Sequence, residues 1–152
     1  MHAWKFATRR KALALLDTDY RGWAFAYAEP NGCLRMLAVL QADASSEAKG
    51  ENFDTESQDD GTRIVLTNVE DAELRYTARV SDTSKFSPLF VSCLARLLAS
   101  YLAGPLIKGK EGIAESKAQY QAFMVEKAAA TGSDANQHQV RPEHKPAWMS
   151  IR

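Results

Sequence analysis

The chain has little of the chemistry from which enzyme and metal sites are built. Only two of its 152 residues are cysteine and three are histidine. Cys33 and Cys93 have no metal-binding or redox spacing, so we expect reduced, buried thiols and not a disulfide. His2, His138 and His144 all lie in the terminal segments, where a preorganised site is hard to build. We therefore expect no enzyme activity, no metal and no cofactor.

Neither sign of charge is in excess. Nineteen Lys and Arg residues balance nineteen Asp and Glu residues, which gives a formal net charge of zero. A dedicated nucleic-acid-binding domain is usually markedly basic, so sequence-specific DNA binding is disfavoured. A neutral chain also does little to oppose association with its own copies.

The longest apolar run, 87–105, has the signals of a helix at both ends. Ser87 can cap the first turn, Pro88 suits the first helical position, and Gly104 followed by Pro105 predicts the end. The polar residues between them, Ser92, Arg96 and Ser100, are spaced four apart and form one narrow stripe. A helix that is apolar on all other sides is typical of a buried central element. Its length and the position of Arg96 argue against a membrane span.

Strand patterns precede this helix. Alternating aromatic residues and alanines predict a strand at 23–28, which we expect to form a hairpin with a second strand at 33–41 across the turn 29–32. Segments 63–67 and 73–80 predict two further strands, and segment 3–16 is compatible with either helix or strand. The alternation in 73–80 indicates a sheet that is covered on one side only, with the apolar helix as its natural cover.

These patterns predict an α+β fold. An antiparallel sheet with hairpins would pack on an antiparallel helix pair, the second helix being 113–130 after a short link. We expect one helix–sheet domain at 1–131, in which 42–61 is an exposed loop, followed by an extended C-terminal arm at 132–152.

The arm is polar but ends in apolar residues, which favours an anchoring role. Trp148 is the candidate anchor, against the alternative that it lies unused in solvent. The candidate contacts with other subunits or partners are Trp148, Met149, Ile151 and Arg152 in the arm, and Trp4 and Phe6 near the start. The basic residues Arg9, Arg10 and Lys11 are candidates for facing DNA phosphates, although such a cluster is more often a solvated surface.

Several segments resemble one known family in the same order. They are HAWKFATRR (2–10), GWAFAYAEPNGCLRM (22–36), IVLTN (64–68), LRYTARVSDTSKFSPLFVSCLARLLASYLAGPL (74–106) and PAWMSIR (146–152). Together they resemble the tail tubular protein A family, the head-to-tail adaptors of short-tailed, podovirus-type bacteriophages and related prophages. Ala3 stands where the family motif usually has proline.

The resemblance implies a virion structural protein and no catalysis. A homo-oligomeric ring of twelve copies would join the portal protein to the tail nozzle protein at the head–tail junction of the virion. Double-stranded DNA would pass through the ring without sequence-specific binding, and assembly would take place in the cytoplasm of the bacterial host, with no membrane involved. The alternative from a different class is a small monomeric host protein that binds or regulates through an exposed sheet face.

Overall fold

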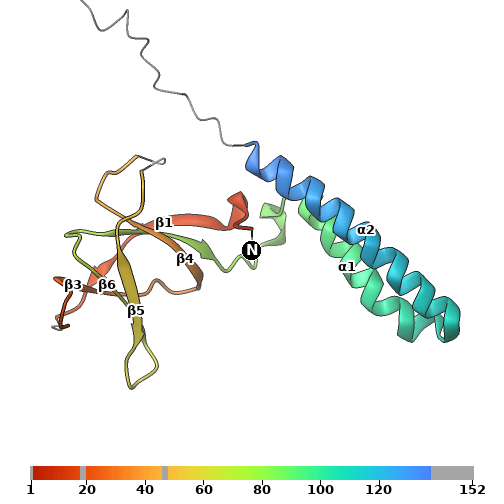
Figure 1. The fold of residues 1–152 in the computed structure, drawn as a ribbon, viewed down its shortest axis with the longest axis horizontal. Helices are drawn as coiled ribbons and strands as arrows, with labels where there is room; N and C mark the ends of the chain where they lie inside the picture. Colours follow the sequence, from red (N-terminus) through yellow and green to blue (C-terminus); the bar gives the residue numbers. More distant parts are fainter. Residues whose placement is uncertain (1, 18–19, 46–47, 138–152) are drawn as a thin grey trace, which may run out of the picture. The chain divides into compact units, whose positions relative to one another are not determined.

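The computed structural model describes residues 2–17, 20–45 and 48–137. Within them the chain forms two compact units, Met1–Lys85 and Phe86–Arg152, of which the first is built from strands and the second from helices (Figure 1). This confirms the α+β class, with antiparallel sheets and a helix pair. The arm expected at 132–152 lies mostly outside the described residues, and 132–135 belong to a helix.

Among the described residues of the first unit there are seven strands in two antiparallel sheets. One sheet has the order β1–β7–β4 and the other has the order β2–β3–β6–β5. The strands are β1 (Thr8–Ala12), β2 (Ala14–Leu15), β3 (Phe25–Ala28), β4 (Cys33–Leu40), β5 (Phe53–Ser57), β6 (Arg63–Thr67) and β7 (Glu73–Ala78). Short 3-10 helices, η1 (Lys5–Ala7) and η2 (Thr83–Lys85), lie near the two ends of the unit.

The two sheets are joined along both sides. β1 and β2 are consecutive parts of one extended segment, in which the N–H of Leu13 donates to the carbonyl of Ala72 at 2.9 Å. On the other side the N–H of Glu51 donates to the carbonyl of Val39 at 2.8 Å, bridging the start of β5 to β4. The strands therefore wrap round a shared core like a small barrel, which leaves few unpaired strand edges.

Both sheets contribute to that core. Leu74, Tyr76 and Ala78 alternate along β7 as the buried positions, and they pack with Val39, Tyr27 and Val65. The prediction that a helix covers this face is therefore wrong: the cover is the neighbouring sheet. Alternation in sequence identifies the buried side of a strand, but it does not identify what lies against it.

The predicted hairpin at 23–41 is also wrong, although both strands exist. β3 pairs with β2 and β6, whereas β4 pairs with β7 in the other sheet. The segment 42–61, expected to be a loop throughout, contributes β5, which pairs with β6 from Phe53↔Thr67 to Ser57↔Arg63. The sequence pattern does not predict β5 because nearly all of its residues are polar. Backbone hydrogen bonds to β6, and not burial of side chains, hold this strand in the sheet.

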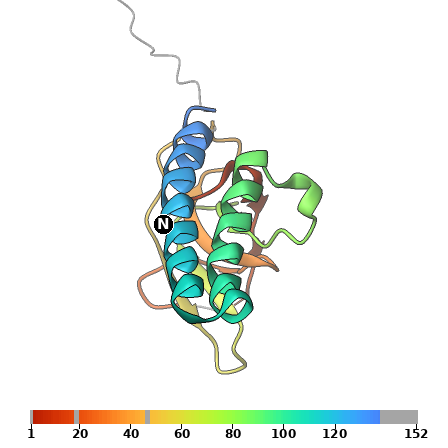
Figure 2. The same ribbon diagram turned by 90° about the vertical axis from the view of Figure 1, so that its right-hand side faces the viewer.

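The second unit is a pair of antiparallel helices, α1 (Pro88–Ile107) and α2 (Gly109–Ala135), seen side by side in Figure 2. Ser87 caps α1 as predicted, because its hydroxyl accepts the N–H of Phe90 at 3.4 Å. The predicted end at Gly104 and Pro105 is wrong. Pro105 lies inside α1, which continues to Ile107. Lys108 follows as the C-cap: its φ is 60° and its N–H donates to the carbonyl of Gly104, so the chain reverses there.

Candidate functional site

The polar stripe of α1 faces α2. The Ser92 hydroxyl donates to Oε2 of Glu126 at 2.6 Å, and Nε of Arg96 lies 3.0 Å from Oε1 of the same carboxylate. Further along, the Ser116 hydroxyl donates to the carbonyl of Ser100 at 2.6 Å. The hydrogen bond from Ser92, and then that from Arg96, lower the pKa of the Glu126 carboxyl. Polar contacts therefore join the two helices.

Because the polar stripe is turned inward, the opposite side of α1 is apolar and exposed. We call this side the outer stripe; it consists of Val91, Leu94, Leu98 and Leu102. These side chains are between 44% and 55% exposed, and their spacing of three or four residues places them on one side of the helix. The expectation that α1 is a buried central helix is thus wrong.

No charge interrupts the outer stripe. Arg96 is the one charged residue of α1, and its guanidinium is held by Glu126 and by the side-chain carbonyl of Gln119 at 3.1 Å. Leu106, 74% exposed, extends the apolar surface toward the end of the helix. Contiguous apolar surface of this kind is typical of an interaction site. The outer stripe is therefore the candidate functional site.

A signal for this surface is present in the sequence. The spacing correctly predicts that Ser92, Arg96 and Ser100 share one stripe, but the prediction that the rest of the helix is buried in a core is wrong. Gln119 and Glu126 on the second helix are the acceptors that Ser92 and Arg96 need, so they indicate that the polar stripe faces that helix.

α1 also has the length and apolar composition of a membrane-crossing helix, and it is the one described helix that does. Core helices of soluble proteins share these properties. Its partner α2 carries charges along its whole length, for example Glu111, Lys117 and Lys127. A hairpin that crossed a bilayer would bring these charges into the apolar interior, where they are unfavourable.

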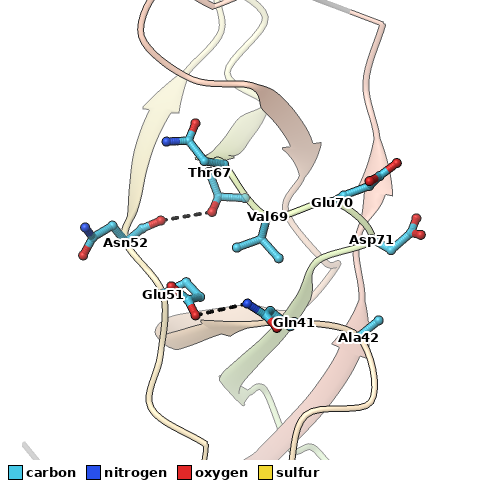
Figure 3. Close-up of a pocket in the computed structure, with 9 residues that line it drawn as sticks. Gln41, Ala42, Glu51, Asn52, Thr67, Val69, Glu70 and Asp71 are labelled. Atoms are coloured by element: carbon cyan, nitrogen blue, oxygen red, sulfur yellow. Dashed lines mark hydrogen bonds between the residues drawn. The ribbon is translucent and has the colours of Figure 1, made fainter.

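The barrel unit contains a polar cavity of about 550 Å³ (Figure 3). Two hydrogen bonds cross its wall, from Nε2 of Gln41 to Oε1 of Glu51 at 3.5 Å and from the Thr67 hydroxyl to the carbonyl of Asn52 at 3.0 Å. The lining residues are Gln41, Ala42, Glu51, Asn52, Thr67, Asn68, Val69, Glu70 and Asp71. They offer carboxylates, amides and one hydroxyl, and we assign no reaction to this arrangement.

The three basic residues predicted to face DNA do not share one face. In β1, Arg9 pairs with Tyr76 and Lys11 with Leu74, whereas Arg10 pairs with Arg75. Arg9 and Lys11 therefore lie on the opposite side of the strand from Arg10. All three are exposed, and DNA contact stays a prediction.

Arg10 is instead one of three arginines on the outward face of its sheet. The register places Arg10 beside Arg75, and Arg35 of β4 beside Thr77 on the same face. Arg10 also forms an ion pair with Glu73 and donates to the carbonyl of Ala44. Arg35 and Arg75 are not among the residues predicted to face DNA, although the alternation in β7 predicts that Arg75 lies opposite the buried residues.

The candidate contact residues near the start of the chain form a row of rings. His2 packs edge-on against Trp4 at 4.9 Å between ring centroids, and Trp4 stacks on Phe6 at 6.1 Å. Trp4 and Phe6 are both partly buried. The other candidate contacts, Trp148, Met149, Ile151 and Arg152, lie outside the described residues.

Neither cysteine has the environment of a nucleophile. Burial, followed by the hydrogen bond to Glu29, raises the pKa of Cys33 from 9.0 to about 11, and burial also raises the pKa of Cys93. Glu29 is itself paired with Arg63, with 3.3 Å between Oε1 and Nη1. Within 2–17, 20–45 and 48–137, no three His, Cys, Asp or Glu side chains are grouped so that they could hold a metal ion.

Comparison of the chain with models of known protein families finds no match, and comparison with curated proteins finds no match either. The functional argument therefore depends on the residues themselves and on the surfaces that the fold exposes.

Proposed function

We propose that this protein is a structural subunit of a phage virion, forming the ring that adapts the head portal to the tail nozzle. The observation that carries the proposal is the uncharged, exposed outer stripe of α1, which requires a protein partner to leave water. The ordered resemblance of segments 2–10, 22–36, 64–68, 74–106 and 146–152 to the tail tubular protein A family supports this kind of assembly.

The composition supports the same role. A neutral chain suits a wall past which DNA must slide, because a basic channel would retain the phosphate backbone. In this proposal the subunits form a closed ring of twelve, contact the portal and the nozzle protein, and act without a cofactor. The ring stands at the head–tail junction of the virion after assembly in the host cytoplasm.

The experiment is to purify the full chain and measure its mass by light scattering over a range of concentrations, alone and mixed with the portal protein. We expect discrete oligomers that appear as rings in negative-stain images, with the portal favouring their formation. A chain that stays monomeric throughout, with or without portal, would favour the small monomeric binding module instead.

A further inference from the structure

Two strands of the barrel unit carry opposite charges along open edges. β1 is the first strand of one sheet and β5 is the last strand of the other, so each has one side without a neighbouring strand among the described residues (Figure 1). β1 has the sequence TRRKA and β5 has the sequence FDTES, and four of the five residues of each strand are exposed. One edge is therefore basic and the other is acidic. An open strand edge is a template for pairing with a further strand.

The hydrogen bonds of β1 show which of its backbone groups lie on the open edge. The N–H of Leu13 donates to the carbonyl of Ala72 at 2.9 Å, in the register that continues through β1 and β7. Backbone groups alternate in direction along an antiparallel strand. Those of Arg9 and Lys11 therefore point to β7, whereas those of Arg10 and of the residues two positions away on either side point outward.

The same reasoning applies to β5. The N–H of Gln58 donates to the carbonyl of Thr62 at 2.8 Å, in the register that continues through β5 and β6. The backbone groups of Asp54 and Glu56 therefore point to β6, and those of Thr55 point outward. In agreement with this, the N–H of Thr55 donates to the carboxylate of its neighbour Asp54 at 2.8 Å.

We infer that β1 of one copy of the chain pairs with β5 of a second copy. When Arg10 lies opposite Thr55 in an antiparallel arrangement, the outward backbone groups of the two strands meet, as β-strand addition requires. The same register forms two pairs of opposite charge on one face: Arg9 with Glu56, and Lys11 with Asp54. Opposite charges directly across two strands stabilise their pairing. Hydrogen bonding and charge therefore select the same register.

The charges also select the partner edge. β1 paired with another β1 in this way would place Arg9 opposite Lys11, and like charges in that position are destabilising. β5 paired with another β5 would likewise place Asp54 opposite Glu56. In the described part of the chain, these four charged groups form no ion pair. They are therefore available to a strand of opposite charge.

The contact joins two different edges, so each copy that uses its β1 still presents its β5 to a further copy. Such a heterologous contact generates a ring when the rotation closes and a filament when it does not. It goes beyond the proposed function, because it does not involve the outer stripe and requires neither twelve copies nor a closed ring.

The test is a pair of charge-reversal variants. Arg9→Glu with Lys11→Glu places acidic residues on both edges, and Asp54→Lys with Glu56→Lys places basic residues on both. Sedimentation velocity should show that each variant alone associates about tenfold or more weakly than the native chain, because two attractive pairs become repulsive. An equimolar mixture should associate like the native chain, since every acidic edge then meets a basic one.

Two further variants are the matched controls. Lys110→Glu with Lys117→Glu, and Glu70→Lys with Glu111→Lys, change the net charge by the same amounts at exposed positions outside both edges. They should leave association unchanged. Circular dichroism of each variant confirms that it folds.

Amide hydrogen exchange reports the strand pairing itself. The N–H groups of Arg10 and Thr55 should exchange more slowly in the associated native chain and in the mixture than in either charge-reversal variant alone. Association that persists in either variant, that mixing does not restore, or that leaves these two amides unprotected would overturn the inference and leave the proposed ring intact. A native chain that is monomeric at every concentration, with or without the portal protein, would overturn the ring as well.

Discussion

Arg96 of α1 and Glu126 of α2 form an ion pair across the helical hairpin, with 3.0 Å between Nε and Oε1. The same carboxylate accepts the Ser92 hydroxyl at 2.6 Å. These contacts orient α1 about its own axis, because they fix which side of the helix meets α2. The apolar outer stripe is exposed as a direct consequence.

The pH dependence of the hairpin should follow from this carboxylate. The hydrogen bonds from Ser92 and Arg96 hold the pKa of Glu126 below its ordinary 4.5. A group with a depressed folded-state pKa stabilises the fold above its unfolded-state pKa and loses that contribution as the pH falls through the folded-state value. Thermal melts should therefore show a loss of stability below about pH 4.5 that is smaller in Glu126→Gln.

Removing the Ser92 hydroxyl should raise the pKa of Glu126 toward its ordinary value, because the hydrogen bond from Ser92 is the largest cause of the shift. An NMR titration of the Glu126 carboxyl in Ser92→Ala measures this directly. Ser133→Ala, exposed on α2 with Glu126, is the control and should leave the titration unchanged. An unaltered Glu126 titration in Ser92→Ala would show that Ser92 does not control this pKa.

The barrel core should be sensitive at Leu74. Its side chain is fully buried between the two sheets, so Leu74→Ala leaves a cavity and should lower the free energy of unfolding by about 2–5 kcal/mol. Leu34 on β4 is 62% exposed, and Leu34→Ala should change it by less than about 0.5 kcal/mol. Urea unfolding of both variants provides the comparison, and equal losses would contradict the assignment of the core.

Tyr27 is buried in the same core with its hydroxyl fully engaged. The hydroxyl donates to the carbonyl of Val69 at 2.8 Å and accepts the N–H of Ala72 at 3.4 Å. Tyr27→Phe leaves both backbone groups without this partner, so we expect a loss of about 1–3 kcal/mol in the free energy of unfolding. Tyr101→Phe should have almost no effect on the unfolding of the monomer, since that ring is in solvent; a similar loss in both would count against the role of Tyr27.

Gly50 of the first unit and Gly104 of α1 differ in whether a side chain would fit at their position. A Cβ at Gly50 would lie 2.8 Å from Cβ of Ala38, so Gly50→Ala forces a shift and should cost about 1–3 kcal/mol of stability. At Gly104, inside α1, a Cβ would meet nothing within 4 Å, and alanine should stabilise the helix by up to about 1 kcal/mol. Thermal unfolding of the two variants should thus shift in opposite directions; a shift in the same direction would contradict one of these environments.

Local patterns in the sequence predict several of the elements and their buried sides, although not β5 or the end of α1. Alternation along 73–80 identified Leu74, Tyr76 and Ala78 as the buried side of a strand, because side chains in a strand point to opposite faces in turn. Ser87 and Pro88 correctly marked the start of α1. Spacing also placed Ser92, Arg96 and Ser100 on one side of that helix.

What each of these faces meets depends on contacts between residues far apart in the chain. β3 and β4 pair in different sheets, and β5 is held by the ladder to β6; such long-range pairing leaves no mark in a local pattern. The same holds for the candidate site. The sequence by itself determined that α1 has one polar and one apolar side, but the contacts of α2 at Glu126 and Gln119 decided that the polar side faces inward and the apolar side remains available to a partner.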